Sequence, residues 1–150
     1  MTSVTHIPVS SHIEGSDPIA QFKMWLEKAE KTELSLATAM TLATATSTGV
    51  PSARMVLLKD VDDQGFTFYT NLESRKAVEL RENPTAALCF HWKASKRQVR
   101  IEGVVQLVDE EEAERAACEL RARDGSSEPD RLLLGADARL VRVGVGVGVG

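Results

Sequence analysis

The sequence predicts a mainly β domain, a small antiparallel barrel with flanking helices. Five short segments show strand-like patterns, the links between them are short, and the regular strand–helix alternation of a parallel sheet is missing. With 150 residues, of which 43% are hydrophobic, the chain is long enough to bury one core. We therefore expect one barrel domain over residues 17–122.

The start of the chain predicts an arm and then a helix. Residues 1–16 are polar and show no periodicity, so we expect a flexible N-terminal arm. Asp17 can cap the helix that follows, with Pro18 at its first position. Apolar residues then recur at steps of three and four, which predicts that one face packs on a core. This face comprises Ile19, Phe22, Trp25, Leu26 and Ala29.

From Ala39 the apolar residues alternate with a period of two, which is typical of strands. The predicted strands are AMTLATAT (39–46), SARMVLLK (52–59), FTFYT (66–70), TAALCFHW (85–92) and RQVRIEGVVQLV (97–108). Short turns between them favour antiparallel pairing. Two further helices are predicted, NLESRKAVELREN (71–83) and DEEEAERAACELRA (109–122).

The end of the chain changes in character. Residues 123–150 show no sustained period and close in a Val-Gly repeat. As a strand, this repeat would leave one face bare and would cost entropy at every Gly. We therefore expect an irregular or disordered C-terminal tail over residues 123–150.

Composition excludes several classes of protein. A net charge of −4 argues against a nucleic-acid partner, which usually requires a basic excess. Cys89 and Cys118 lack CxxC spacing, so no disulfide framework and no metal site is predicted. The sequence contains neither an apolar run of about 18 residues nor a basic start followed by a hydrophobic run. We expect a cytoplasmic protein with no membrane contact.

The stretch FYTNLESRK, residues 68–76, places a hydroxyl, a guanidinium and an ammonium group at a predicted helix start. A helix start presents unpaired N–H groups, and Arg and Lys add a fork and a point charge, so the stretch is typical of a phosphate cradle. In the alternative interpretation, Ser74 only caps a surface helix, and Arg75 and Lys76 are solvated.

Arg54 and Lys59 flank the apolar part of the strand RMVLLK. A charge in such a strand needs a partner. Strict alternation places the two side chains on opposite faces. Three interpretations remain open: they hold different groups, the pleat breaks at Lys59 near the strand end, or both are charges on the barrel rim.

The chain resembles the pyridoxamine 5'-phosphate oxidase family in four stretches, in that family's order and spacing. They are DPIAQFKMWLEKA, AMTLATAT, RMVLLKDVDDQGFTFYTNLESRKAVELRENPTAALCFHW and RQVRIEG, and the resemblance covers about residues 17–108. It implies an FMN-binding split barrel, an antiparallel Greek-key barrel with helices. It also implies a homodimer with two flavins at the interface.

The resemblance also assigns roles to particular residues. The FMN phosphate is assigned to Arg54, Arg75 and Lys76, with Tyr69 and Thr70 completing the cradle. The remaining flavin contacts are assigned to Met55, Val56 and Leu57 along the ring and to Gln98. Lys59 is assigned to the substrate phosphate, so that Arg54 and Lys59 serve two different groups.

The implied reaction is the FMN-dependent oxidation of pyridoxamine 5'-phosphate or pyridoxine 5'-phosphate to pyridoxal 5'-phosphate, with dioxygen as the electron acceptor. Because the cofactor supplies the electron sink, we expect no catalytic side chain. His91, beside Trp92 in a predicted strand, is expected to pack rather than to catalyse.

The resemblance fails after residue 108. The family continues with a Tyr, an Arg-Pro-Arg and Ser stretch that grips the substrate phosphate, and SQIGAW-like residues. The corresponding text here, AACELRARDGSSEPD, contains no Tyr. We therefore expect a truncated or altered C-terminal part. The alternative function is a split-barrel flavin-binding protein that has a different substrate or lacks B6 oxidase activity.

Overall fold

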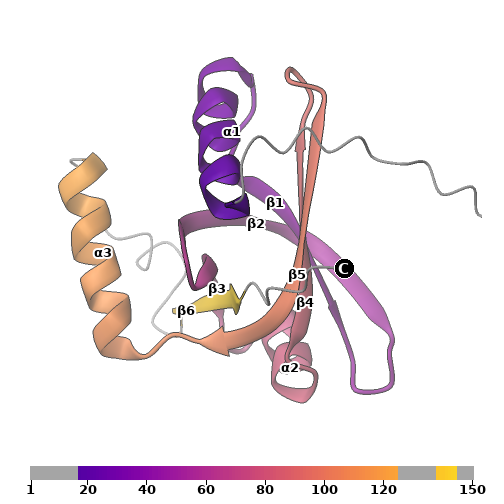
Figure 1. The fold of residues 1–150 in the computed structure, drawn as a ribbon. Coiled ribbons are helices and arrows are strands. Elements are labelled where there is room, and N and C mark those ends of the chain that lie inside the picture. Colours follow the sequence, from indigo (N-terminus) through magenta and orange to yellow (C-terminus); the bar gives the residue numbers. More distant parts are fainter. Residues whose placement is uncertain (1–16, 125–137, 145–150) are drawn as a thin grey trace, which may run out of the picture.

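The computed structural model describes residues 17–124 and 138–144. Its strands close into an antiparallel barrel in the order β1-β2-β3-β6-β5-β4, with helices around it (Figure 1). The strands are β1 (Ala39–Ala45), β2 (Pro51–Asp62), β3 (Gly65–Asn71), β4 (Thr85–Trp92), β5 (Arg97–Leu107) and β6 (Ala138–Gly144). The helices are α1 (Pro18–Thr32), α2 (Arg75–Glu82) and α3 (Glu110–Asp124). The predicted fold class is confirmed.

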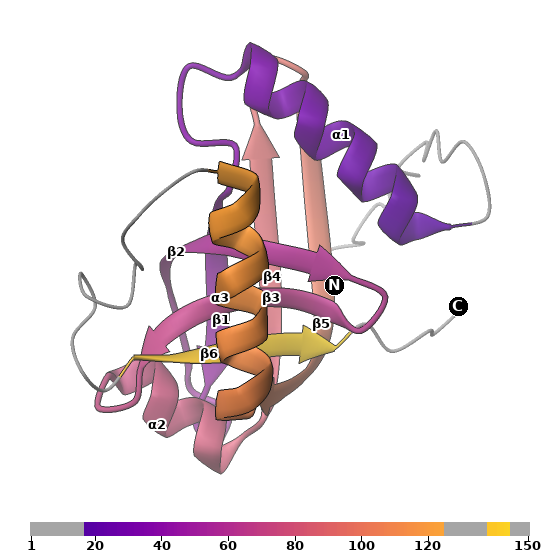
Figure 2. The same cartoon turned by 90° about the vertical axis from the view of Figure 1, so that its left-hand side faces the viewer.

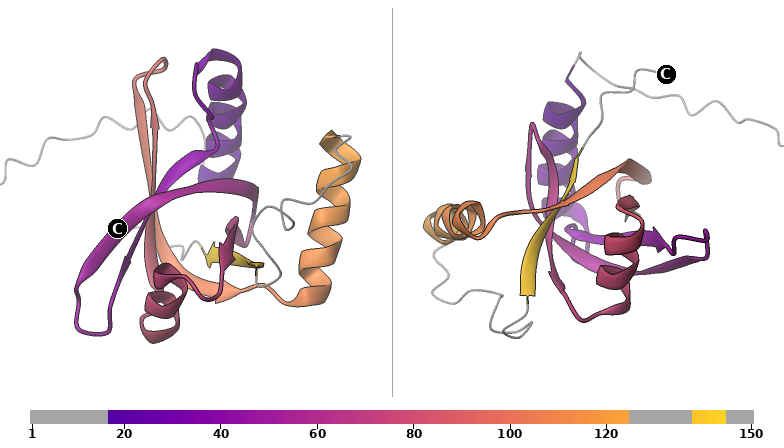
Figure 3. Two further views of the ribbon diagram at one scale, coloured as in Figure 1. Left: turned by 180° about the vertical axis from the view of Figure 1, so that it is seen from behind. Right: turned by 90° about the horizontal axis from the view of Figure 1, so that it is seen from below.

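Helix α1 begins where the sequence predicts. The Asp17 carboxylate accepts hydrogen bonds from the backbone N–H groups of Ile19 (2.9 Å) and Ala20 (3.2 Å), and Pro18 occupies the first position. Seen from the front and from behind, α1 and α2 lie at opposite ends of the barrel (Figures 1 and 3).

None of the helices in the described part of the chain is long and apolar enough to cross a membrane.

Alternating residues of the strands fill the barrel interior, and α1 adds an aromatic side chain to it. The Phe22 ring lies 4.8 Å from the Phe66 ring and 5.1 Å from the Phe90 ring, centroid to centroid. Edge and tilted contacts of this kind stabilise aromatic clusters beyond their buried area. Trp92 is buried, and its indole N–H donates to the Ala37 carbonyl at 2.8 Å.

Strand β2 contains a bulge at Lys59. Leu58 lies opposite Phe68, but Asp60 already lies opposite Thr67, so the register shifts at the residue between them. One extra residue interrupts the alternation of faces. The break in the pleat is therefore confirmed, but the strand does not end there, because β2 continues to Asp62.

The prediction of an irregular tail over residues 123–150 is wrong for the part that the structure describes. Helix α3 extends to Asp124, and Ala138–Gly144 forms β6, which pairs with β3 along its whole length and with β5 near its end. Neither face of β6 is bare, because Leu140, Val141 and Val143 are all buried. The rest of the predicted tail and the predicted arm over residues 1–16 lie outside the described residues.

Within the described residues, only the start of helix α3 contacts the barrel, where Glu110 and Glu112 approach Arg139 and Arg142 of β6, and the rest of the helix stands away from it (Figures 1 and 2). Arg142 of β6 is buried and donates hydrogen bonds to Glu112 of α3 and to Gln64 in the turn between β2 and β3. A buried guanidinium needs such partners to offset its lost hydration. This one residue therefore ties three segments that are distant in the sequence.

Two glycines permit β6 to close the barrel. A Cβ atom on Gly103 of β5 would lie 1.9 Å from the Gly144 carbonyl oxygen, and one on Gly65 would lie 2.1 Å from the Val143 carbonyl oxygen. Both obstacles are backbone atoms of a paired strand, which cannot move without breaking the pairing. Strands β3 and β5 thus carry a glycine where the backbone of β6 passes closest to them.

We predict that Gly103→Ala lowers the free energy of unfolding by about 1–3 kcal/mol, because overpacking displaces the strands. Gly144→Ala is the matched control, since its Cβ atom would meet nothing closer than 3.5 Å. It should stay within about 0.5 kcal/mol of the wild type in urea denaturation. Equal effects of the two substitutions would contradict the position of β6 in the barrel.

Candidate functional site

The turn before α2 holds the start of that helix in place. The Asn71 side chain accepts from the Glu73 N–H (2.8 Å), and the Asn71 carbonyl accepts from the Ser74 hydroxyl (2.6 Å). Ser74 precedes the helix but makes no side-chain hydrogen bond to its N–H groups. Ser74 is therefore the N-cap residue by position, as the alternative interpretation has it, but its hydroxyl bonds to the turn and not to the helix.

A buried carboxylate lies between α2 and the barrel. Glu79 is 3% exposed. One of its oxygens, Oε2, accepts from the hydroxyls of Thr44 (2.5 Å) and Ser52 (2.6 Å) on β1 and β2. The other oxygen, Oε1, accepts from Arg75 Nε at 2.9 Å. Glu79 therefore connects the helix to two strands.

Arg54 of β2 joins the same group of side chains. One terminal nitrogen donates to the Thr44 hydroxyl (2.5 Å) and to the Leu42 carbonyl (3.3 Å), and the other donates to the Ser52 hydroxyl. The second nitrogen lies 3.6 Å from Glu79 Oε2. The partner that a charge in this strand needs is thus a buried carboxylate. We call Thr44, Ser52, Arg54, Arg75 and Glu79 the Glu79 cluster.

The cluster keeps its carboxylate ionised. Hydrogen bonds from Ser52 and Thr44, and then the contact with Arg75, lower the pKa of Glu79 to about 2, although burial acts in the opposite direction. Two guanidinium groups share this single negative charge. The cluster therefore carries an excess of positive charge at neutral pH.

Lys76 adds a third cation beside the cluster. Burial lowers the pKa of the Lys76 ammonium, and the positive charge of Arg54 lowers it further. The two cations are thus close enough to repel each other, and an anion between them would relieve this repulsion. Arg75 has a side chain 68% exposed and reaches Glu79 through Nε, so its two terminal nitrogens lie at the accessible end. The structure thus brings Arg54 and Arg75 to one carboxylate, and Lys76 follows Arg75 at the start of α2.

The predicted ring contacts are divided between the two faces of β2. Met55 and Leu57 are 62% and 41% exposed on the outer face. Val56 points the other way and packs against the core, so only its backbone faces outward. Gln98 is exposed on the outer face of β5, and β1 and β4 lie between β5 and β2. At about 4.8 Å per strand, Gln98 and Met55 are on the order of 14 Å apart, so this fold does not bring them into contact.

The remaining predicted contacts lie on β3 and at the bulge. Thr70 is buried, and its hydroxyl donates to the Asn71 carbonyl at 3.4 Å. Tyr69 is half-buried, and alternation directs it away from the face that Thr70 occupies. Lys59 is half-buried at the bulge of β2, five residues from Arg54. Tyr69 and Thr70 thus point to opposite faces of β3, and Lys59 is separated from Arg54 along β2.

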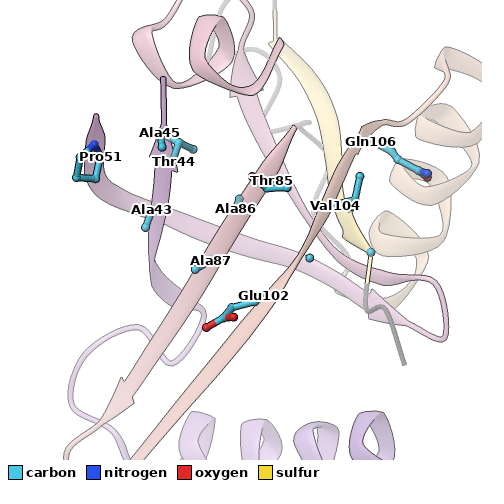
Figure 4. Close-up of a pocket in the computed structure, with 12 residues that line it drawn as sticks. Ala43, Thr44, Ala45, Pro51, Thr85, Ala86, Ala87, Glu102, Val104 and Gln106 are labelled. Carbon is cyan, nitrogen blue, oxygen red and sulfur yellow. The ribbon is translucent and has the colours of Figure 1, made fainter. Parts of the chain in front are cut away.

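Two hollows lie elsewhere on the described part of the chain. One, of about 760 Å³, extends over the outer face of β1, β4 and β5, where Ala43, Ala45 and Ala87 form a floor of small side chains (Figure 4). The other, of about 300 Å³, lies between α1 and β5. None of the predicted flavin contacts lines either hollow.

Sequence reasoning missed Glu79, Thr44 and Ser52. One signal was available, since Glu79 follows Arg75 by four residues on the predicted helix, a spacing that brings opposite charges together. On an exposed helix this pair would be of little consequence. Only burial against β1 and β2 makes it the centre of the cluster.

Comparison with known proteins places the chain in a family. The family model described as pyridoxamine 5'-phosphate oxidase matches residues 26–143, which include the Glu79 cluster and nearly all of β6. Proteins named pyridoxine/pyridoxamine 5'-phosphate oxidase are 59% identical over 97 residues in Salinibacter ruber and 56% identical over 108 residues in Maricaulis maris. These alignments cover 65% and 72% of this chain but 45% and 48% of the relatives. The chain thus spans about half the length of the curated relatives it matches.

Solved structures agree with this placement. PhzG from Burkholderia lata, in complex with tetrahydrophenazine-1-carboxylic acid, aligns with a TM-score of 0.65 and 26% identity over 96% of this chain and 84% of its own. A pyridoxamine 5'-phosphate oxidase-related, FMN-binding protein from Nostoc punctiforme aligns with a TM-score of 0.63 and 18% identity, over 87% and 82% of the two chains. The second likeness shows the fold alone. By its sequence and its fold, the chain belongs to the pyridoxamine 5'-phosphate oxidase family.

Proposed function

We propose that the chain binds FMN and takes part in the oxidation of pyridoxamine 5'-phosphate or pyridoxine 5'-phosphate to pyridoxal 5'-phosphate, with dioxygen as the electron acceptor. The observation that supports the proposal is that Arg54 and Arg75 both approach the buried Glu79 carboxylate, with Lys76 near enough to Arg54 for the pKa of its ammonium to fall. The names of the most similar relatives support the choice of reaction.

The cation group suits the phosphate of FMN. A monophosphate is close to doubly charged at neutral pH, and it accepts forked hydrogen bonds from Arg and a point contact from Lys. Arg75 and Lys76 are also the first two residues of α2, where free N–H groups and the helix dipole favour an anion. The two arginines, Lys76 and the start of α2 thus each support the assignment of an anion to this end of the helix.

FMN, when bound, supplies the acceptor for the two electrons that leave the substrate. The chain's own part is to hold and orient the bound groups. The exposed side chains of Met55 and Leu57 offer an apolar surface to a flavin ring. Lys59, set apart from Arg54 by the bulge, is proposed to contact the substrate phosphate.

A homodimer is proposed as the assembly that completes the site. The outer face of the barrel exposes Met55, Leu57, Val104 and Leu107 beside the alanine floor of the larger hollow. An apolar face of this kind marks a contact surface. A partner on it would also bring a second set of side chains toward the ring contacts, which are spread over β2 and β5 in one protomer.

The alternative function is flavin binding with a different substrate or without B6 oxidation. One observation favours it: the similar PhzG structure is a complex with tetrahydrophenazine-1-carboxylic acid. The cation group would serve FMN equally in this case, since it contacts only the phosphate. The two functions therefore differ in substrate and not in cofactor.

A purified sample distinguishes the two functions. We expect flavin absorbance after incubation with FMN and gel filtration, and hydrogen peroxide release when pyridoxamine 5'-phosphate is added in air. Bound flavin without peroxide release would support the alternative. No retained flavin would refute both, because both depend on the same phosphate site.

We predict that Arg75→Ala weakens FMN binding by about 1.5–3 kcal/mol, as expected for the loss of a charged hydrogen bond. Arg81→Ala is the control, because Arg81 lies on the same helix and bonds only to the Leu72 carbonyl among the contacts described (3.2 Å). It should leave the FMN dissociation constant within about twofold. Fluorescence quenching of FMN measures both constants, and similar losses in the two variants would count against the site.

For Lys59→Ala we predict a separation of cofactor and substrate effects. FMN affinity should be unchanged, whereas the KM for pyridoxamine 5'-phosphate should rise roughly ten- to hundredfold, because a charged contact to the substrate phosphate is lost. Lys93→Ala, in the turn after β4, is the control for removal of a lysine charge. Unaltered kinetics in Lys59→Ala would remove this residue from the substrate site.

A further inference from the structure

We infer that Glu79 is the positioning residue of the phosphate site, whose carboxylate holds both arginines in place so that its neutralisation weakens anion binding. This inference rests on the proposed binding of FMN. It is unexpected on charge alone, because a carboxylate beside two guanidinium groups should compete with an anion. The argument depends on the direction of each hydrogen bond in the cluster.

The two hydroxyls of the cluster relay the contact between Arg54 and Glu79. Arg54 donates to the oxygens of Thr44 and Ser52, because a guanidinium has no acceptor. Each hydroxyl has a single proton, which is then directed to Glu79 Oε2. Oε2 must therefore accept on this side.

Arg75, on the helix side of the cluster, likewise requires the other oxygen of Glu79 to be an acceptor. Arg75 Nε can only donate, and it donates to Glu79 Oε1. Both oxygens of residue 79 must thus be acceptors, which only an ionised carboxylate provides. The pKa of Glu79, lowered to about 2, keeps the group in this form under ordinary conditions.

A glutamine at this position cannot satisfy both sides. With its oxygen toward Arg75, its amide could donate to the second lone pairs of the two hydroxyls, but the protons of those hydroxyls would then lose Oε2 as their acceptor. With its oxygen toward the hydroxyls, its amide would face the Arg75 N–H, and two donors would meet. The first orientation leaves the hydroxyls that hold Arg54 without an acceptor for their protons, and the second leaves Arg75 without its acceptor.

Released arginines bind anions more weakly. A side chain that is already held loses less freedom when a ligand binds, whereas a mobile one must be ordered at that moment. Arg75 is the more sensitive of the two, because its side chain is 68% exposed and Glu79 is its described anchor. Arg54 is 23% exposed and retains the Leu42 carbonyl.

The test compares FMN with riboflavin, which has the same ring system and no phosphate. For Glu79→Gln we expect the FMN dissociation constant to rise about tenfold or more, while the riboflavin constant stays within about twofold. Glu82→Gln, at the last and exposed position of α2, is the control for loss of one negative charge from the same helix. It should change neither constant.

Each other outcome overturns the inference. Tighter FMN binding by Glu79→Gln would show that the carboxylate is only a counter-ion, and equal weakening of both ligands would show a general structural role. Unchanged FMN binding would show no role. A wild-type chain that binds FMN no better than riboflavin would instead refute the proposed phosphate site itself.

Ser52→Ala is the second variant, for the case in which Glu79→Gln does not fold. It removes one of the two relays between Arg54 and Glu79 and leaves the charges in place. We expect a smaller rise in the FMN constant, about three- to tenfold, again with riboflavin unchanged. Equal FMN constants in this variant and the wild type would also overturn the inference.

Acid titration provides a readout without ligand. The pKa of Glu79 is about 2 in the folded chain and 4.5 ordinarily, so its ionised form stabilises the fold above pH 4.5 and this contribution is lost as the pH falls toward 2. The groups that face it are Arg54, Arg75, Thr44 and Ser52. The difference in Tm between wild type and Glu79→Gln should therefore shrink between these pH values, and a constant difference would contradict the assignment.

Discussion

The structure depends on one buried carboxylate that must be compensated. Glu79 lies almost fully out of water, and an ionised group in that position is tolerated only with several hydrogen-bond donors around it. These donors come from β1, β2 and α2, so compensation of the charge also sets how α2 sits on the barrel. The same contacts aim two guanidinium groups toward one place. The packing of α2 and the proposed anion site thus depend on the same buried charge.

Closure of the barrel is the second constraint on the site. Strand β6 occupies the gap between β3 and β5, and glycines at positions 65 and 103 allow its backbone to approach. The buried Arg142 links this strand to α3 and to the turn between β2 and β3. A closed barrel holds β1 and β2 in register, and this register places Thr44 opposite Ser52. The chain achieves this closure although it spans about half the length of its relatives.

The bulge in β2 separates two cations that are close in the sequence. Arg54 lies before the bulge and faces inward to the Glu79 cluster, whereas Lys59 lies at the break in alternation. A cofactor phosphate and a substrate phosphate would each need a cation of its own, so these two cations would have to lie apart. In the proposed function, Arg54 and Lys59 are assigned to these two phosphates, and the bulge separates them within six residues of sequence.

The helix start at Asp17, the five strands within residues 39–108 and the family could all be predicted from the sequence. Capping, period-two alternation and a long motif are local properties of the chain, so they do not depend on the fold. The sequence also indicated which cations could meet a phosphate. Only the tertiary structure decided that Ala138–Gly144 is a strand, since a short Val- and Arg-containing segment becomes one only when β3 and β5 cover both its edges. Only the tertiary structure decided, likewise, that Glu79 is buried. An Arg–Glu pair with this spacing has the same sequence pattern on an exposed helix and on a helix packed against a barrel. Burial of Glu79 comes from β1 and β2, whose Thr44 and Ser52 lie 35 and 27 residues away in the sequence.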